Sequence, residues 1–289
     1  MRLRIRRSQP ERAGSSPAQP KTCGSRTSRL PRSKAEASTA IVHTATTILG
    51  IPVDHLTLAQ AVDQMAGMIA AGGAHQVATI NPEFVMAAQQ NLPFRTVLQQ
   101  ADLCVADGVG LLLAARWQKR PLPERVTGNE LLQALAERAA AAGWSFFFLG
   151  AAPGVAESAA AALQHSWPAL RIAGCYAGSP RPEEAAAIIE RVRTASPDIL
   201  LVAYGAPAQD VWIARCQTTL QVPLAIGVGG AFDFLAGRVP RAPRWMQCWG
   251  LEWLFRLLRQ PWRWRRMLSL PRFAWAAWQE RQRAAQFER

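Results

Sequence analysis

Short runs of apolar and β-branched residues alternate with longer stretches rich in alanine and leucine from residue 76 to residue 230. Uninterrupted apolar runs of this kind are typical of strands covered on both faces, and the longer stretches have the length of helices. The pattern predicts strands at 76–80, 103–105, 145–149, 171–176, 199–204 and 223–228 and helices at about 83–99, 109–117, 129–142, 155–166, 183–195 and 208–219. Strands that alternate with helices pair in parallel, so we predict an α/β domain with a Rossmann-like parallel sheet and helices on both faces.

The segments that precede this alternation differ from it in composition. Residues 44–72 predict a small β–α unit, in which Asp54 and Thr57 lie near the start of the helix. Residues 1–43 are basic and polar, and the first 40 of them contain ten Lys and Arg but almost no large apolar side chain. Such a segment buries too little surface to offset the entropy of ordering, so we expect a disordered basic tail. A secretory signal requires an apolar run after its basic residues, and none follows the arginines of this tail. We place the α/β domain at 44–240.

Residues 241–289 are rich in arginine and tryptophan. Twelve arginines and no lysine occur from residue 238 onward, and seven of the eleven tryptophans lie between residues 245 and 278. Tryptophan beside arginine is typical of a segment that lies in a membrane interface, which predicts a C-terminal helical, membrane-associating appendage. Two alternatives stay open: the tryptophans pack onto the body, or the segment binds single-stranded nucleic acid. The arginines whose spacing of three, four and three residues suits one helical face are Arg256, Arg259, Arg263 and Arg266.

The formal net charge of +13 is concentrated at the two ends of the chain. Residues 41–237 contain eleven basic and fifteen acidic residues, so the body is mildly acidic. This distribution argues against a nucleic-acid-binding core and indicates basic ends that meet an anionic surface. Five widely spaced cysteines without a Cys-x-x-Cys pair, and four histidines without ligand spacing, argue against a disulfide framework and a structural zinc site.

Glycines and uncommon polar residues follow nearly every predicted strand. Ligands of open α/β sheets bind beyond the carboxyl ends of the strands, and glycine turns bring backbone N–H groups close to an anion such as a diphosphate. None of these turns is a G-x-G-x-x-G or a P-loop sequence, which argues against a dinucleotide dehydrogenase and a nucleoside triphosphatase. Each glycine could instead only close a turn, and Asn81 could cap a helix. The candidates at these exits are Thr79, Asn81, Gly108, Gly150, Tyr176, Gly205, Gln209, Gly229 and Asp233.

Asp107 and Arg125 carry the most specific chemistry of these turns. Asp107 follows an apolar strand and precedes Gly108, so its carboxylate is placed to accept a proton from an attacking hydroxyl; the alternative is a helix cap. Arg125 precedes a predicted helix, where a guanidinium suits bidentate phosphate binding, although a salt bridge to Glu124 or Glu130 is equally compatible. The chain contains no Asp-x-Asp pair, so in a glycosyl transfer backbone N–H groups and arginine, rather than a metal, would meet the phosphate charge.

Seven motifs in order along the chain resemble the WecG/TagA/CpsF family, which is glycosyltransferase family 26. The resemblance covers roughly residues 48–270 and leaves out the N-terminal tail. Its longest elements are Thr79-Ile80-Asn81-Pro82-Glu83, Asp107-Gly108-Val109-Gly110, Glu124-Arg125-Val126-Thr127-Gly128, Gly205-Ala206-Pro207-Ala208-Gln209-Asp210 and Gly229-Gly230-Ala231-Phe232-Asp233.

The resemblance implies an inverting, metal-independent transfer without cofactor, from a UDP-sugar to a polyprenyl-diphosphate-linked sugar. Typical members attach N-acetylmannosamine, or its uronic acid, to undecaprenyl-diphosphate-N-acetylglucosamine in cell-surface polysaccharide synthesis. It implies that Asp107 is the general base, and Thr79, Asn81, Arg125 and Gln209 match polar positions of the family's pocket. Two departures are Ala106, where the family often has proline, and Asp210, where glutamate is common. The second departure could alter donor choice.

The resemblance also gives the C-terminal appendage a role in membrane targeting and in contact with the acceptor diphosphate. The expected location is the inner face of the bacterial plasma membrane, with an anionic membrane surface as a partner, no nucleic acid, and assembly into a homo-oligomer left open. The alternatives are a glucosyl or other hexosyl donor in exopolysaccharide assembly, a nucleotide-sugar oxidoreductase or epimerase, and a basic nucleic-acid-binding protein. The arginines expected at the acceptor diphosphate or membrane are Arg241, Arg244, Arg256, Arg259, Arg263 and Arg266.

Overall fold

The computed structural model describes residues 44–240, 242–243, 246, 252–259, 261 and 264–287. The chain divides into two units, residues 1–42 and residues 43–289, and the description below concerns the second. The predicted tail at 1–43 lies outside the described residues. Three of the appendage arginines, Arg241, Arg244 and Arg263, lie outside them too, as does the side chain of Arg256.

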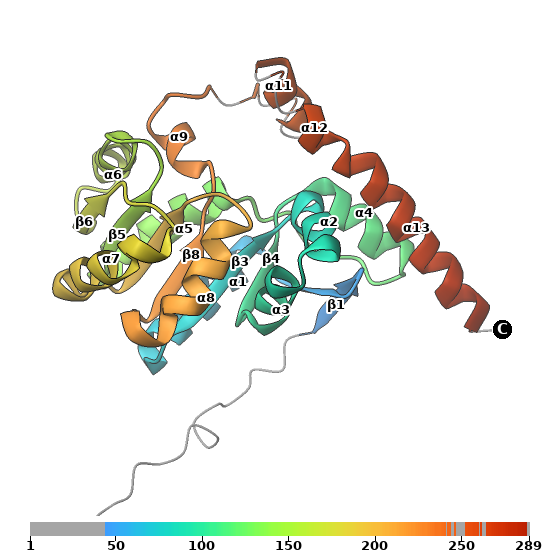
Figure 1. Ribbon diagram of the computed structural model, residues 1–289, viewed down its shortest axis with the longest axis horizontal. Helices are drawn as coiled ribbons and strands as arrows, with labels where there is room; N and C mark the ends of the chain where they lie inside the picture. The colour runs from blue at the N-terminus through green and yellow to red at the C-terminus, as the bar shows by residue number, and fades with distance from the viewer. Residues whose placement is uncertain are drawn as a thin grey trace, which may run out of the picture. The chain divides into compact units, whose positions relative to one another are not determined.

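Six parallel strands form the central sheet, in the order β4-β3-β8-β7-β5-β6 (Figure 1). All the strand pairs run parallel, which confirms the predicted α/β architecture. From β3 the chain moves outward to β4, whereas from β5 it moves outward to the opposite edge at β6. Connections that diverge in this way leave a crevice beyond the carboxyl ends of the strands. The strands are β3 (His75–Ile80), β4 (Leu103–Ala106), β5 (Ser145–Gly150), β6 (Arg171–Tyr176), β7 (Ile199–Ala203) and β8 (Leu224–Gly227).

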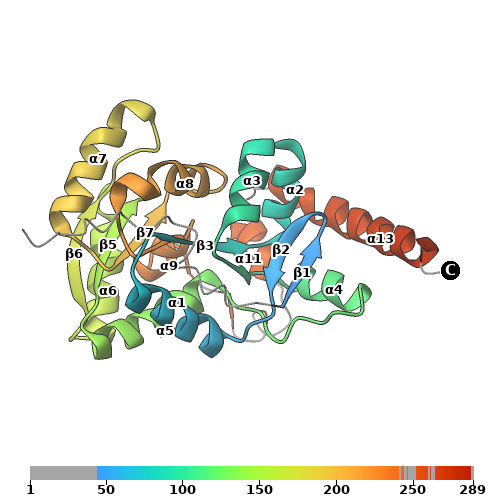
Figure 2. The same ribbon diagram turned by 90° about the horizontal axis from the view of Figure 1, so that it is seen from below.

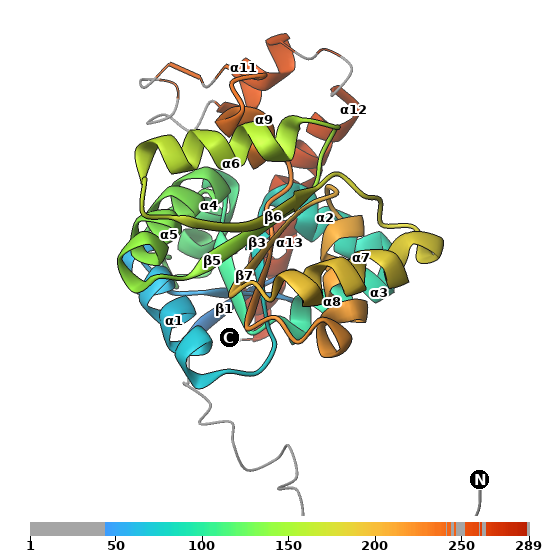
Figure 3. The same ribbon diagram turned by 90° about the vertical axis from the view of Figure 1, so that its left-hand side faces the viewer.

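Helices cover both faces of the sheet (Figures 2 and 3). Side chains alternate along each strand, so Phe146 and Phe148 enter a core with α1, α5, α6 and α9, whereas Phe147 enters a core with α7 and α8 on the other face. A third core joins β3 and β4 to α2, α3 and α4. The helices are α1 (Leu58–Ala71), α2 (Pro82–Gln90), α3 (Leu92–Gln100), α4 (Val109–Trp117), α5 (Gly128–Ala142), α6 (Val155–Ser166), α7 (Pro182–Ala195), α8 (Ala208–Leu220), α9 (Ala231–Leu235), α11 (Glu252–Arg259), α12 (Trp264–Met267) and α13 (Ser269–Phe287).

Helix boundaries follow the capping residues, with one correction to the sequence prediction. Thr57, which was expected near the start of this helix, caps α1: its hydroxyl accepts from the Gln60 N–H at 3.3 Å, and the Gln60 side chain accepts from the Thr57 N–H at 2.9 Å. The single helix predicted at 83–99 is wrong, because it divides into α2 and α3 at Asn91. The Asn91 side chain accepts from the Phe94 N–H at 3.0 Å, and Pro93 has no N–H with which to continue the first helix.

A short antiparallel hairpin precedes the sheet and supports the C-terminal helix. Its strands β1 (Ala45–Ile48) and β2 (Ile51–Asp54) pair only with each other and bury apolar side chains against α3 and α4. The Leu49 N–H at its turn donates to both carboxylate oxygens of Glu280 in α13, at 3.1 Å each. The Gln118 side chain donates to the same carboxylate at 2.8 Å. The C-terminal helix is therefore held at a point 231 residues away in sequence.

α13 packs along α2 and α4 with one face and exposes tryptophan on another (Figure 1). Phe273 and Ala277 are 3% and 2% exposed, and Glu280 continues the same face at helical spacing. Trp275 and Trp278 stack with their ring centroids 5.1 Å apart and remain 60% and 40% exposed. Of the helices that the structure describes, none is both long and apolar enough to cross a bilayer.

Candidate active site

A cavity of about 560 Å³ opens at the carboxyl ends of the central strands. Its volume lies within the range of about 300–1,000 Å³ typical of small-molecule sites. The turns after β3, β4, β7 and β8 form its inner walls, and residues of α11, α12 and α13 form the remaining side. The residues proposed from sequence that line it are Thr79, Asn81, Asp107, Gly108, Arg125, Gly205, Gln209, Gly229 and Arg266.

Asp107 is placed in this cavity by the turn between β4 and α4. The Asp107 N–H donates to the Ile80 carbonyl at 2.6 Å. This hydrogen bond connects the carboxyl ends of β3 and β4. Gly108 has a φ of 156°, and a Cβ at this position would lie 3.0 Å from Pro82 Cδ, so only glycine lets the turn pack this closely. Helix α4 starts with Gly108 at its cap position and has no side-chain cap bond. The cap position of α4 is therefore Gly108 and not Asp107, and Asp107 lines the cavity.

Asn81 and Thr79 are partly committed to the fold. Asn81 Oδ1 accepts from the Phe84 N–H at 3.0 Å and so caps α2, as the alternative interpretation of this residue expected. Its side-chain N–H groups make no hydrogen bond with the rest of the described chain. The Thr79 hydroxyl donates to the Gly227 carbonyl at 3.1 Å. Both side chains still line the cavity.

Arg125 enters the cavity just before α5. The Val126 N–H donates to the Ala106 carbonyl at 2.8 Å, which attaches this segment to the end of β4, and Thr127 caps α5. The side-chain oxygen of Asn129 is buried beside the cavity, with no hydrogen bond from any residue that the structure describes. Sequence reasoning did not single out Asn129, although it directly follows the Glu124–Gly128 motif and a first-turn polar residue is a recognisable signal.

Gln209 ties two of the glycine turns together. Its side-chain oxygen accepts from the Gly205 N–H at 3.2 Å and from the Gly229 N–H at 2.9 Å, and the residue is 1% exposed. A Cβ at residue 227 would lie 2.6 Å from Gln209 Nε2, so glycine at this position makes room for the amide. The carbonyl oxygen of Gln209 thus connects the turns that follow β7 and β8, and its contact with the donor stays a prediction.

Asp210 lies next to Gln209 but inside the protein. Asp210 is 0% exposed, and neither of its carboxyl oxygens has a hydrogen-bond partner among the described residues. Burial raises the pKa of this carboxyl from its ordinary value of 3.8 to about 7, although the Gln209 amide and its own N–H lower the pKa in part. Asp210 is therefore largely uncharged below neutral pH.

Three other residues proposed from sequence do not line the cavity. Tyr176 lies under the Arg191 guanidinium, whose carbon is 4.5 Å from the ring centroid. The carbonyl of Asp233 accepts from the N–H groups of Arg238 and Val239 at 3.0 and 3.2 Å, where α9 ends. Gly150 allows close approach of β5 to β7. All three follow or end at the carboxyl edge of the sheet, so their proposed contact with the donor stays a prediction.

The C-terminal segment supplies one arginine to the described part of the cavity. Arg266 Nε lies 3.4 Å from Glu83 Oε2, and this pair connects α12 to α2. Arg259 lies over the Phe255 ring within α11, at 5.6 Å, and does not line the cavity. Sequence reasoning missed the apolar part of this wall, whose side chains include Leu270 and Phe273. Their spacing of three residues on an amphipathic helix is the signal that could have found them.

Among the residues that the structure describes, no group of three or more His, Cys, Asp or Glu side chains is arranged to hold a metal ion.

Comparison with known proteins agrees with the motifs. The model of the glycosyl transferase WecG/TagA/CpsF family matches residues 46–286. An N-acetylglucosaminyldiphosphoundecaprenol N-acetyl-beta-D-mannosaminyltransferase of Bacillus spizizenii is 34% identical over 200 residues, which cover 69% of this chain and 77% of the relative. The protein of the same name from Bacillus subtilis is 31% identical over 213 residues, which cover 74% and 80%.

Proposed function

Because this chain belongs to the WecG/TagA/CpsF glycosyltransferase family and is therefore a glycosyltransferase, we propose that it transfers N-acetylmannosamine from its UDP derivative to undecaprenyl-diphosphate-N-acetylglucosamine. Family membership selects transfer over the oxidoreductase, epimerase and nucleic-acid-binding alternatives. The names of the relatives favour N-acetylmannosamine over its uronic acid and over a glucosyl donor. The observation that carries the proposal is a carboxylate, Asp107, in a cavity walled by glycine turns and helix N-termini.

Asp107 is proposed as the general base of a single displacement. Its carboxylate takes the proton of the acceptor hydroxyl as the oxygen attacks the anomeric carbon of the donor. The new glycosidic bond forms while the bond from the anomeric carbon to the UDP oxygen breaks, and UDP leaves with the electron pair. Attack from the face opposite the leaving group inverts the anomeric centre. Such a base contributes roughly 10²–10⁴-fold in rate.

The charge that develops on UDP needs stabilisation. First-turn N–H groups of a helix have no intrahelical partners, and the first residues of α4 and α5 line the cavity. The Arg125 guanidinium lines the same cavity and suits a phosphate oxygen. Together with the absence of an Asp-x-Asp pair from the chain, these groups support a metal-independent transfer. Tyr176, Gly150 and Asp233 remain candidates for contacts with the rest of the donor.

The protein is proposed to work at the inner face of the plasma membrane as a peripheral protein. An acceptor carried on undecaprenol lies in the membrane, so the enzyme must reach it there. The exposed Trp275–Trp278 stack on α13 suits the headgroup region of a bilayer, where indole rings are favoured. Arginines of the segment 241–289 suit lipid phosphates, each contributing about 1 kcal/mol near an anionic surface.

A donor panel tests the proposed function. Purified full-length protein is incubated with a polyprenyl-diphosphate-linked N-acetylglucosamine and, in turn, with UDP-N-acetylmannosamine, its uronic acid, UDP-N-acetylglucosamine and UDP-glucose. We expect mass spectrometry to find a disaccharide product with the first donor and an anomeric configuration opposite to that of the donor. Product from only another donor would refute the proposed substrate, and a retained configuration would refute the single displacement.

A further inference from the structure

The side-chain amide of Asn129 lies in the wall of the cavity of about 560 Å³ without a hydrogen-bond partner. Its Oδ1 atom is buried, and neither end of the amide makes a hydrogen bond within the described part of the chain. A buried acceptor without a donor is uncommon, because burial takes away the hydrogen bonds that water would supply. Rotation about the Cβ–Cγ bond exchanges the two ends, so either end can turn toward an occupant of the cavity.

The start of α5 does not use this amide. Thr127 caps the helix: its hydroxyl accepts from the Glu130 N–H at 3.3 Å and donates to the Glu130 carboxylate at 2.7 Å. Asparagine is also a weaker helix former than alanine or leucine. The folding of α5 therefore gives no reason for an asparagine at residue 129, whereas contact with a ligand in the cavity does.

Asn129 lies close to the proposed general base. It follows Gly128, and a Cβ built on Gly128 would lie 3.9 Å from Asp107 Oδ2 and 3.9 Å from Thr79 Cγ2. These are ordinary van der Waals separations, so the first residue of α5 is next to the carboxylate. Consecutive Cα atoms are about 3.8 Å apart, which keeps Asn129 near the reacting atoms.

The proposed displacement brings the C2 substituent of the donor sugar within reach of this position. The attacking oxygen lies about 2.6–3.2 Å from its base and about 3–3.5 Å from the anomeric carbon. The C2 substituent is attached to the next carbon of the ring. The uracil, in contrast, is separated from the anomeric carbon by the diphosphate and the ribose, so it lies much further from Asp107.

A side-chain amide matches an acetamido group in its hydrogen-bonding atoms. An ionised diphosphate has only acceptor oxygens, so it cannot donate to Asn129 Oδ1. The 2-acetamido group of N-acetylmannosamine has one N–H and one carbonyl, and an amide can pair with both. A hydroxyl at C2 has a single oxygen, which cannot align with both ends of the amide at once.

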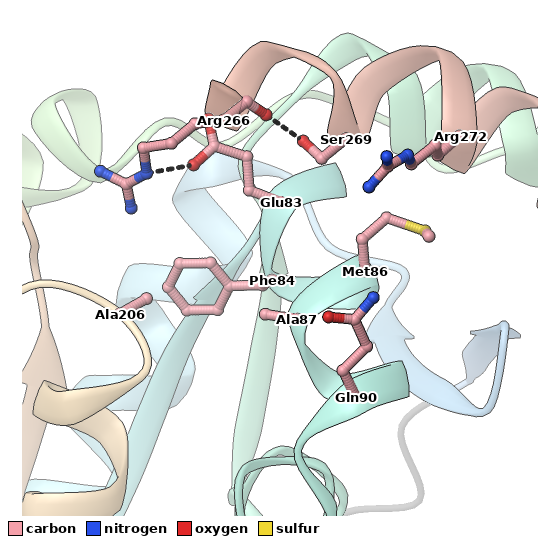
Figure 4. A pocket seen from close by; sticks show the side chains of 9 residues that line it. All are labelled: Glu83, Phe84, Met86, Ala87, Gln90, Ala206, Arg266, Ser269 and Arg272. Atoms are coloured by element: carbon pink, nitrogen blue, oxygen red, sulfur yellow. Dashed lines mark hydrogen bonds and ion pairs between the residues drawn. The ribbon is translucent and has the colours of Figure 1, made fainter. Parts of the chain in front are cut away.

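A charged pair marks a different part of the cavity wall. Arg266 Nε and Glu83 Oε2 are 3.4 Å apart, and both residues also line a smaller cavity of about 220 Å³ beside α2 (Figure 4). Asn129 does not line that smaller cavity. Its neutral amide, on α5 rather than on α2 or α12, suits a neutral substituent of the sugar.

From these observations we propose that Asn129 is a specificity-determining residue whose amide binds the 2-acetamido group of the transferred sugar. Oδ1 accepts a hydrogen bond from the acetamido N–H, and Nδ2 donates one to the acetamido carbonyl. Residue 129 thereby favours N-acetylated donors over hexoses with a hydroxyl at C2. This inference rests on the proposed function, because it takes the donor to be an N-acetylated UDP-sugar.

Three ligands measure this preference without turnover. Calorimetry on the full chain compares UDP, UDP-mannose and UDP-N-acetylmannosamine. We expect the unmodified protein to bind UDP-N-acetylmannosamine about tenfold more tightly than UDP-mannose, because only the acetamido group satisfies both ends of the amide. Equal affinities for the two UDP-sugars overturn the inference.

A pair of variants on the same helix tests Asn129. Asn129→Leu removes the amide at similar side-chain size; it should reduce the tenfold ratio to about one and leave the affinity for UDP unchanged. It should also lower kcat/KM for UDP-N-acetylmannosamine about tenfold, with the acceptor KM unchanged. Gln133→Leu removes an amide from an exposed position of α5 outside the cavity and should keep the ratio.

Three results for Asn129→Leu overturn the inference. An unchanged ratio would mean that the amide does not contact the acetamido group. Weaker binding of UDP itself would place Asn129 at the nucleotide. A raised acceptor KM with an unchanged ratio would place it at the acceptor sugar.

A conservative variant separates a direct contact from a structural role. Asn129→Asp keeps an acceptor oxygen for the acetamido N–H, so its ratio should lie between those of the unmodified protein and Asn129→Leu. Its negative charge affects both UDP-sugars alike and cancels from the ratio. A ratio equal to that of Asn129→Leu would contradict the hydrogen bond to the acetamido N–H.

The test stays decisive if a variant or the proposed function fails. Thermal unfolding of each variant is measured first, and Asn129→Ala replaces Asn129→Leu if leucine prevents folding. Absence of transfer from every UDP-sugar by the unmodified protein refutes the proposed function. The ratio of the two affinities does not depend on turnover, so it still decides whether the inference holds.

Discussion

Replacing Asp210 with asparagine removes a carboxyl group that is completely buried beside Gln209. Its folded-state pKa is raised from 3.8 to about 7, mainly by burial. Each pH unit between these values corresponds to about 1.4 kcal/mol, so ionising Asp210 in the folded protein costs about 4 kcal/mol relative to the unfolded chain. Because the folded-state pKa is the higher one, protonated Asp210 favours the folded state. This contribution to stability is fully present below pH 3.8 and is lost as the pH rises from 3.8 through about 7.

Urea unfolding of the wild type and of Asp210→Asn, followed by circular dichroism between pH 4 and pH 8, measures this contribution. Asparagine cannot ionise in this range. The free energy of unfolding of the variant minus that of the wild type should therefore rise by about 4 kcal/mol from pH 4 to pH 8. Any constant cost of burying the asparagine amide, and the titration of all other groups, cancels from this change. Asp63→Asn, at an exposed position of α1, is the matched control.

A difference between wild type and Asp210→Asn that stays constant with pH would refute the reasoning. It would mean that the folded protein solvates or pairs the Asp210 carboxylate as well as the unfolded chain does. If the difference in unfolding free energy rose by the same amount for Asp63→Asn, the change in net charge and not the burial of Asp210 would cause the effect.

Four further predictions concern the site and the C-terminal helix. Asp107→Asn should lower kcat by about 10²–10⁴-fold while calorimetry finds unchanged UDP binding; wild-type turnover would contradict its role as base. Gln209→Ala removes two hydrogen bonds and should lower the urea unfolding free energy by about 1–3 kcal/mol; no change would mean that the turns hold without it. Glu280→Ala should speed proteolysis within α13 and raise the acceptor KM, and an unchanged digestion pattern would contradict its anchoring role. Trp275→Ala with Trp278→Ala should weaken sedimentation with phosphatidylglycerol vesicles, and equal sedimentation would leave the tryptophan stack without a membrane role.

The strands and most helices could be predicted because their signals are local. A continuous apolar run such as 145–149 is compatible only with a strand or helix buried on all sides, and the flanking glycines at Gly143 and Gly150 limit it to strand length. The division of the helix at 83–99 had a local signal too, in Asn91 and Pro93. The helical periodicity that continues across these residues concealed it.

Part of the candidate site followed from topology. Parallel strands place their carboxyl ends at one edge, so the alternation of strands and helices is enough to expect Asp107, Asn81 and Gln209 near each other. Their individual contacts could not be predicted. The two N–H groups that bind the Gln209 oxygen come from different turns, and the burial that raises the pKa of Asp210 depends on the elements packed around it.

The order of apolar and polar residues was sufficient to determine the α/β class, the strand exits and the residue types gathered there, because periodicity and turn chemistry act over a few neighbouring residues. The side of the cavity formed by α13 required the folded chain. Phe273 lies on the face of α13 that packs against α2 and α4, and Glu280 binds Leu49. These contacts join segments more than 150 residues apart, and their geometry depends on the packing of every element between them rather than on any local preference.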